Sequence, residues 1–155
     1  MTDDLRELYQ EVILDHGKHP RNFGKLDGAD HQAHGHNPMC GDTLFVFLAL
    51  DENGRITGVS FDGKGCAISV ASASMMTEIV KGKTEAEANR MFDYFHKLCT
   101  QDDPPDEAGL DPDDVDRLQV LSGVRQFPVR VKCATLAWHT LSAALDRRNA
   151  PVKTE

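Results

Sequence analysis

The sequence predicts an α+β fold in which a small antiparallel β-sheet of about three strands is covered by about five helices. Residues 43–50 are rich in β-branched, aromatic and leucine side chains over the length of one strand. In residues 56–61, Thr57, Val59 and Phe61 alternate with small side chains, which is typical of a strand with one buried face. The turn-forming residues 51–54, Asp-Glu-Asn-Gly, join the two strands into a hairpin.

Apolar side chains recur at the 3.6-residue spacing of an amphipathic helix in five other stretches: residues 3–15, 67–81, 84–98, 115–121 and 134–148. Gly17 ends the first helix and Gly82 the second, because glycine readily takes the backbone conformation that follows a helix. Thr84 and Glu87 have the spacing of a capping box at the start of the third. Together with the hairpin, these helices define the fold class.

Two segments lack such a period. Residues 16–36 are rich in Gly, His, Asp and Asn, so we expect loop or irregular edge structure there. Five of the seven histidines lie in this segment. Clustered histidines can bind metal, but most loop histidines are solvated or cap a neighbouring element. We expect the tail from Asn149 onward to fray.

Length and charge exclude several classes of function. The 155 residues suffice for one domain with a core. The chain has 17 basic and 25 acidic residues, a net charge of −8, which argues against a nucleic-acid backbone or an anionic membrane as partner. It begins without a basic segment followed by an apolar run, and no window approaches the roughly 18 apolar residues of a membrane span. We therefore expect a cytoplasmic protein.

A single domain over residues 1–155 is expected to carry an acidic insertion around residues 100–126. Residues 100–114 contain seven acids, three prolines and no Lys or Arg, which indicates a loop or excursion. Asp111 and Pro112 nevertheless form a good helix start, with a cap and a proline at the first helical position. A short helix should follow and end at Ser122 and Gly123.

The four cysteines are the residues most informative about chemistry. In a reducing compartment they are better explained as metal ligands or catalytic thiols than as disulfides. Cys99 falls on the apolar stripe of a predicted helix, so we assign it to the core. Cys40 lies on a turn before a strand, whereas Cys66 and Cys133 are each expected at a helix N-terminus, where free N–H groups favour thiolate.

Cys40, Asp42, Cys66 and Cys133 would supply three sulfurs and one oxygen, which is enough for a tetrahedral Zn²⁺ ion. A carboxylate is a less well matched ligand than a thiolate at such a site and can give way, which suggests ligand exchange. Each cysteine can alternatively fill a small gap in the core.

Four ionised ligands around a dication leave a site that needs positive charge nearby. Four cationic residues flank the ligands in sequence: Lys64, Arg125, Arg130 and Lys132. Ordinary surface charge explains Lys64 equally well. Arg125, Arg130 and Lys132 are therefore the predicted supporting residues.

Several motifs in order resemble the NifU N-terminal, IscU-like family of iron–sulfur cluster assembly proteins, and more closely its zinc-dependent SufU branch. The motifs are Leu-Tyr-Gln-Glu-Val-Ile-Leu-Asp-His with His-Pro-Arg-Asn after it, Asn-Pro-Met-Cys-Gly-Asp at 37–42, Gly-Lys-Gly-Cys-Ala-Ile-Ser at 63–69 and Lys-Cys-Ala-Thr-Leu-Ala-Trp at 132–138. Scaffold proteins of the IscU type have a histidine before the last cysteine and a short connection ahead of it. Lys132 and the long acidic insertion depart from that pattern and resemble SufU.

The resemblance implies an IscU/NifU-N-like fold and a partner, a pyridoxal-phosphate-dependent cysteine desulfurase of the SufS type. It implies a zinc-dependent sulfurtransferase of the SUF system, with Cys40 accepting sulfur as a persulfide and Asp42, Cys66 and Cys133 retaining Zn²⁺. Downstream iron–sulfur assembly machinery would receive the sulfur. Two alternatives remain open: a non-enzymatic scaffold that builds a [2Fe–2S] cluster on the same ligands, and a merely structural zinc domain.

Overall fold

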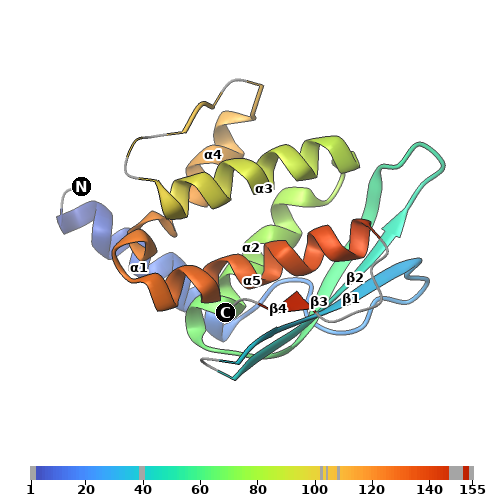
Figure 1. Ribbon diagram of the computed structural model, residues 1–155, viewed down its shortest axis with the longest axis horizontal. Helices are drawn as coiled ribbons and strands as arrows, with labels where there is room; N and C mark the ends of the chain where they lie inside the picture. Colours follow the sequence, from blue (N-terminus) through green and yellow to red (C-terminus); the bar gives the residue numbers. More distant parts are fainter. Residues whose placement is uncertain are drawn as a thin grey trace.

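The computed structural model describes residues 3–38, 41–101, 103, 105–107, 109–146 and 152–153. The helices gather on one side of a four-stranded sheet (Figure 1). In chain order the elements are α1 (Asp3–Lys18), β1 (His31–Asn37), β2 (Asp42–Leu50), β3 (Ile56–Lys64), α2 (Ala67–Val80), α3 (Glu85–Thr100), α4 (Pro112–Gln119), the 3₁₀ helix η1 (Ser122–Gln126), α5 (Pro128–Leu145) and β4 (Val152–Lys153).

The predicted α+β class is confirmed. Strands β1, β2 and β3 are antiparallel neighbours, and the short β4 pairs parallel with β1, which gives the order β3-β2-β1-β4. The register pairs Asn37 with Asp42 and Thr43 with Lys64. One end of β1, the start of β2 and the end of β3 therefore lie together, immediately before α2 begins.

Strand β1 differs from the expectation of a loop or irregular edge over residues 16–36. Its side chains alternate between buried and more exposed, but the inward residues are His31, Ala33, Gly35 and Asn37, which are small or polar. No apolar alternation marked this strand, so periodicity could not find it. Gly35 lies directly against α5, where a Cβ atom would overlap the Thr140 hydroxyl.

Strand β4 corrects the expectation that the tail frays. Val152 pairs with Gly35 and Lys153 with His36, so these two residues extend the sheet at the edge of β1. The rest of the tail from residue 147 onward lies outside the described residues.

The core lies between the sheet and helices α2, α3 and α5. Leu44, Val46 and Leu48 of β2 point into it, and Trp138 of α5 is 1% exposed. Cys99 is buried there as predicted, and burial raises the pKa of its thiol to about 12 although nearby Arg125 opposes the shift.

Helix starts follow the sequence signals. Thr84 and Glu87 form the predicted capping box of α3, and Asp111 caps α4 by accepting the N–H of Asp113. An ion pair of 2.7 Å between Lys83 and the buried carboxylate of Asp114 ties α4 to the turn between α2 and α3. None of the described helices is long and apolar enough to cross a membrane.

Candidate metal centre

Three of the four predicted ligands converge at the end of the sheet next to α2. One ligand atom each from Asp42, Cys66 and Cys133 lies within 4.8 Å of the other two. Cys40, the predicted fourth ligand, lies outside the described residues. In the turn before β2, the Gly41 N–H donates to the Asn37 carbonyl at 2.9 Å, and Gly41 has a positive φ of 73°.

Cys66 occupies the helix start that the sequence predicted. It is the N-cap of α2, and its sulfur accepts the N–H of Ser69 at 3.5 Å. Its own N–H donates to Asp42 Oδ1 at 2.9 Å, and its sulfur lies 3.7 Å from Asp42 Oδ2. Cys66 is therefore exposed at a helix start, where backbone N–H groups lack intrahelical partners.

Cys133 does not lie at a helix N-terminus, so that part of the prediction is wrong. Helix α5 begins at Pro128, because proline fits the first helical position, where its missing N–H costs nothing. Cys133 therefore falls in the second turn and is 3% exposed. Its sulfur lies 3.8 Å from the side-chain amide nitrogen of Asn37, which donates to it.

The chemistry of this donor set fits a thiolate-binding dication such as Zn²⁺. Asp42 and Cys133 are buried and Cys66 is exposed, and their two sulfurs and one carboxylate oxygen are ligand types that zinc selects. The hydroxyl of Ser69, 0% exposed and in the first turn of α2, has no hydrogen-bond partner among the described residues. Such an orphaned polar atom is typical of a site that is completed by a ligand. The ligand roles themselves remain predictions.

In the described part of the chain, Arg125 and Arg130 contact groups other than the three predicted ligands. Arg125 donates to the Gln101 carbonyl at 2.8 Å, and the guanidinium of Arg130 lies 4.7 Å from the Phe127 ring centroid. Both line a groove of about 600 Å³ between α1, η1 and the start of α5, which reaches Ile68 near Cys66. Lys132 is half-buried. Their supporting role stays a prediction.

Two residues beside the cluster had no assigned role in the sequence analysis. Asn37 contacts Cys133, and Ser69 contacts Cys66 through its backbone. Both lie within the motifs that carry the family resemblance, but only the strand register and the helix cap show what they touch. His36 lies one step farther out, with Nδ1 3.1 Å from the Asp42 carbonyl oxygen.

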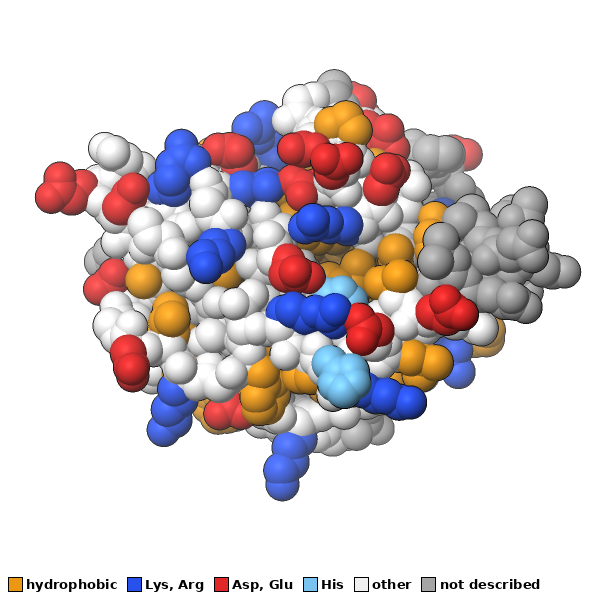
Figure 2. All heavy atoms as spheres, turned by 180° about the vertical axis from the view of Figure 1, so that it is seen from behind, with side chains coloured by type: hydrophobic (Ala, Val, Ile, Leu, Met, Phe, Trp, Pro, Cys, Tyr) orange, Lys and Arg blue, Asp and Glu red, His pale blue; other side chains and the backbone are white. Residues whose placement is uncertain are grey.

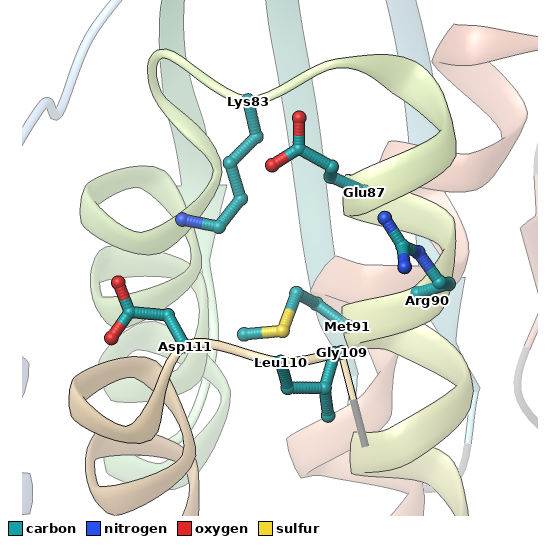
Figure 3. A pocket seen from close by; sticks show the side chains of 7 residues that line it. All are labelled: Lys83, Glu87, Arg90, Met91, Gly109, Leu110 and Asp111. Atoms are coloured by element: carbon teal, nitrogen blue, oxygen red, sulfur yellow. The ribbon is translucent and has the colours of Figure 1, made fainter. Parts of the chain in front are cut away.

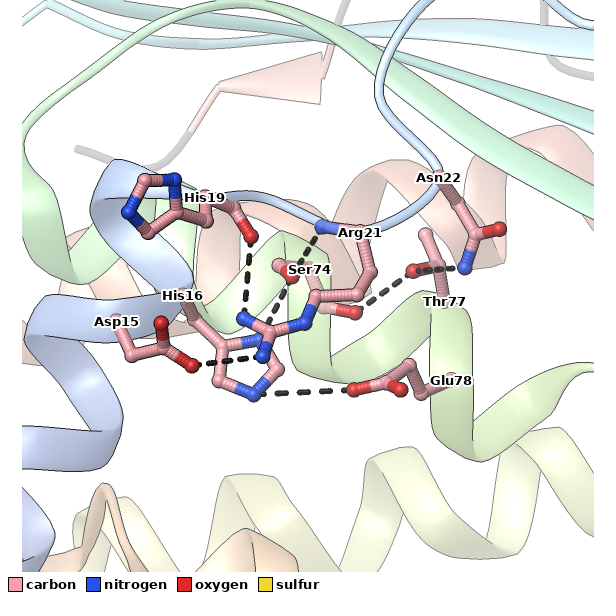
Figure 4. Close-up of polar contacts among 8 residues, drawn as sticks. All are labelled: Asp15, His16, His19, Arg21, Asn22, Ser74, Thr77 and Glu78. Carbon is pink, nitrogen blue, oxygen red and sulfur yellow. Dashed lines mark hydrogen bonds and ion pairs between the residues drawn. The ribbon is translucent and has the colours of Figure 1, made fainter.

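Two other histidines of residues 16–36, His16 and His31, contact helices of the fold. His16 joins α1 to α2: its Nδ1 is 2.7 Å from the Ser74 hydroxyl, and its Nε2 is 3.7 Å from Glu78 (Figure 4). Burial, together with the positive charge of Arg21, lowers the pKa of His16. His31 lies 3.1 Å from the Ala144 carbonyl oxygen on α5.

Two further hollows lie away from the metal centre. The face opposite that of Figure 1 has a hollow with hydrophobic side chains on its floor (Figure 2), where α1, α2 and α4 line a groove of about 550 Å³. A small cavity of about 90 Å³ lies between α3 and the segment before α4 (Figure 3). Its lining mixes Lys83 and Arg90 with Glu87 and Asp111.

The fold and the site together define an α+β domain that gathers thiols and a carboxylate at one end of a small sheet. The chain belongs to the NifU-like N-terminal domain family, whose model matches residues 8–110.

The relatives of this chain include a protein described as a sulfurtransferase and others described as scaffold proteins. The chain is 41% identical to the zinc-dependent sulfurtransferase SufU of Bacillus subtilis over 93% of each chain. It is 39% identical to the iron–sulfur cluster assembly scaffold protein IscU of Streptococcus pyogenes over 92% of this chain and 86% of that protein. A crystal structure of FiSufU from Fervidobacterium islandicum AW-1, a proposed scaffold protein for the SUF system, is 33% identical with a TM-score of 0.78 over 90% of this chain and 98% of that one.

Proposed function

We propose that the protein is a zinc-dependent sulfur acceptor in the cytoplasm, which takes persulfide sulfur from a SufS-type cysteine desulfurase for iron–sulfur cluster assembly. The observation that carries the proposal is the mixed cluster of Asp42, Cys66 and Cys133 within 4.8 Å, on the strand that follows Cys40 and on two helices. The likeness to a zinc-dependent sulfurtransferase supports it.

Cys40, Asp42, Cys66 and Cys133 would hold the metal in this proposal. Bound Zn²⁺ keeps cysteine ligands as thiolates at neutral pH and restrains their nucleophilicity. The Cys66 N–H donates to Asp42 Oδ1 at 2.9 Å, which would keep the carboxylate oriented toward the cluster during ligand exchange.

The sulfur transfer is a displacement at sulfur that needs no external oxidant or reductant. The Cys40 thiolate attacks the outer sulfur of a cysteine persulfide on the desulfurase. A sulfur–sulfur bond forms at Cys40 while the one on the desulfurase breaks, and the desulfurase cysteine leaves as a thiolate. The proton of the transferred sulfur remains with it or passes to that thiolate.

A desulfurase assay tests this function. Alanine production by the desulfurase is measured with the zinc-loaded protein, with the chelated protein and without it. We expect stimulation by the loaded protein and its loss with Cys40→Ser, while the control Cys99→Ala, which changes a buried thiol outside the site, stimulates normally. Stimulation by Cys40→Ser at the wild-type level would remove the acceptor role from Cys40.

A non-enzymatic scaffold for a [2Fe–2S] cluster is the second candidate function. The same thiol and carboxylate donors can ligate iron, and the relative from Streptococcus pyogenes is described as a scaffold protein. Metal and sulfide analysis of protein purified without chelator separates the two functions. Stoichiometric iron and sulfide with little zinc would favour the scaffold, whereas stoichiometric zinc favours the sulfur acceptor.

A further inference from the structure

The three converging side chains accept hydrogen bonds from donors of different kinds. The Cys66 sulfur accepts the backbone N–H of Ser69, and Asp42 accepts the backbone N–H of Cys66. The Cys133 sulfur accepts from the side-chain amide of Asn37. A backbone donor survives most substitutions, whereas the donor to Cys133 depends on one side chain.

The fold fixes Asn37 firmly in this position. It is the last residue of β1, is 0% exposed, and pairs across the sheet with the ligand Asp42. Its carbonyl accepts the Gly41 N–H in the turn before β2. The edge of β1 is in turn covered by β4, which pairs with Gly35 and His36. Asn37 therefore connects the turn, the sheet and the sulfur on α5.

Helix geometry explains why Cys133 needs a side-chain donor. Cys66 sits at a helix start, where unpaired N–H groups face the sulfur, but Cys133 lies in the second turn of α5, where the backbone N–H groups bond to carbonyls of the preceding turn. An N–H donor to a metal-bound thiolate orients the sulfur and stabilises its negative charge.

We infer that Asn37 is a positioning residue of the metal centre: its amide holds the Cys133 sulfur in place and thereby slows the loss of bound metal. This inference rests on the metal binding in the proposed function, but not on sulfur transfer. Removing an outer partner of a metal ligand typically weakens metal binding by about 10–100-fold.

The test compares Asn37→Ala and Asn37→Leu with a matched control, Ser72→Ala. Leucine has the same number and branching of side-chain heavy atoms as asparagine without an N–H donor, so it replaces the alanine variant if that one does not fold. Ser72 is also 0% exposed, and its hydroxyl donates to the carbonyl of Ala134, next to Cys133. Circular dichroism confirms folding of every variant.

Two measurements on the intact chain report on the metal centre. Transfer of Zn²⁺ to a chromogenic chelator should be about 10–100-fold faster in the Asn37 variants and within about two-fold of wild type in Ser72→Ala. In the Co²⁺-loaded protein, the sulfur-to-cobalt charge-transfer band should move to longer wavelength in the Asn37 variants only, because the sulfur loses a hydrogen-bond donor.

The outcomes separate this inference from the proposed function. Wild-type rates and spectra in folded Asn37 variants would overturn the role of Asn37 and leave the function standing. Equal acceleration in Ser72→Ala would also overturn it, because any buried polar loss near α5 would then suffice. A wild-type protein that binds neither Zn²⁺ nor Co²⁺ would overturn both, whereas failure of desulfurase stimulation alone would overturn only the function.

Discussion

The two helices that bring cysteines to the candidate metal centre present them in opposite ways. Helix α2 begins immediately after Cys66, which is exposed and whose sulfur accepts the backbone N–H of Ser69. Helix α5 carries Cys133 in its second turn, 3% exposed and bonded to the side chain of Asn37. The Cys66 sulfur is therefore positioned by local helix geometry, whereas the Cys133 sulfur is positioned by a tertiary contact. A change in tertiary packing should therefore displace Cys133 before it displaces Cys66.

Replacing either cysteine has the largest expected effect. Cys66→Ser and Cys133→Ser each remove a thiolate, and we expect each to lose stoichiometric zinc in metal analysis after gel filtration. Without metal the two should differ. Cys133→Ser buries a hydroxyl and should lower the free energy of unfolding by about 1–2 kcal/mol, whereas Cys66→Ser should change it by less than about 0.5 kcal/mol, because serine is a good N-cap. Equal losses in urea unfolding with chelator would contradict the comparison.

Two glycines test how closely strands β3 and β1 are packed against their neighbours. A Cβ on Gly63, whose φ is +132°, would overlap the Thr43 carbonyl oxygen, whereas one on Gly35 would overlap the Thr140 hydroxyl. We expect Gly63→Ala to cost about 3 kcal/mol and Gly35→Ala about 1–2 kcal/mol in urea unfolding, because a backbone atom yields less than a side chain.

A double variant sharpens this difference. Thr140→Ala removes the hydroxyl that a side chain at position 35 would meet, so the combined Gly35→Ala/Thr140→Ala variant should lose about 1 kcal/mol less than the sum of the single losses. Strict additivity of the two losses would show that the strand, not the Thr140 side chain, absorbs the overlap.

The orphaned hydroxyl of Ser69 gives a smaller effect of opposite sign. Ser69→Ala should raise the free energy of unfolding of the metal-free protein by about 1 kcal/mol, because it removes a buried hydroxyl that has no partner among the described residues. Ser72→Ala should lower it by about 1 kcal/mol, because its hydroxyl donates to the Ala134 carbonyl. Destabilisation by both variants in chelator would show that the Ser69 hydroxyl has a partner in solution.

The smallest expected effect is a pH dependence of the free energy of unfolding that arises from His16, in the contact between α1 and α2. Burial lowers the pKa of His16 from its ordinary value of 6.5, opposed by Glu78 and Asp15 and assisted by Arg21 and Arg117. The unfolded chain therefore binds a proton more readily than the folded one. The contribution of neutral His16 to stability is complete above about pH 6.5 and is lost as the pH falls through its folded pKa.

His16→Gln should flatten this dependence, and His19→Gln, at an exposed position on the same segment, should leave it unchanged. Urea unfolding from pH 7.5 to about 5 in chelator measures both variants. Hydrogen exchange at pH 5.5 should then show faster opening of α1 and α2 than of α5. Equal opening of the two sides would count against a local role of His16.

Much of the fold was predictable because its signals are local. The capping box at Thr84 and Glu87, the cap at Asp111 and the apolar periods each depend on neighbouring residues alone. Strand β1 was not predictable in this way, since its inward residues are small or polar. Their burial depends on the packing of β1 against α5, which is distant in sequence. The position of Cys133 was mispredicted because Pro128 was interpreted as breaking the chain before the helix instead of beginning it.

The candidate site was predictable as a set of residue types but not as an arrangement. Cys66 at a helix start followed from Gly65 and the helical period after it, and its convergence with Asp42 and Cys133 required the strand register. The contact from Asn37 to Cys133 spans 96 positions in sequence, so no local pattern could reveal it.

The burial of Cys99 makes thiol chemistry a selective reporter. With a pKa of about 12 and 1% exposure, its thiol stays protonated and inaccessible to alkylating reagents at neutral pH. Cys133 is also buried, at 3% exposure, whereas Cys66 is exposed. Comparing the labelling of Cys66 by mass spectrometry with and without metal should therefore report on metal binding, with Cys99 as an internal standard that reacts only when the protein unfolds.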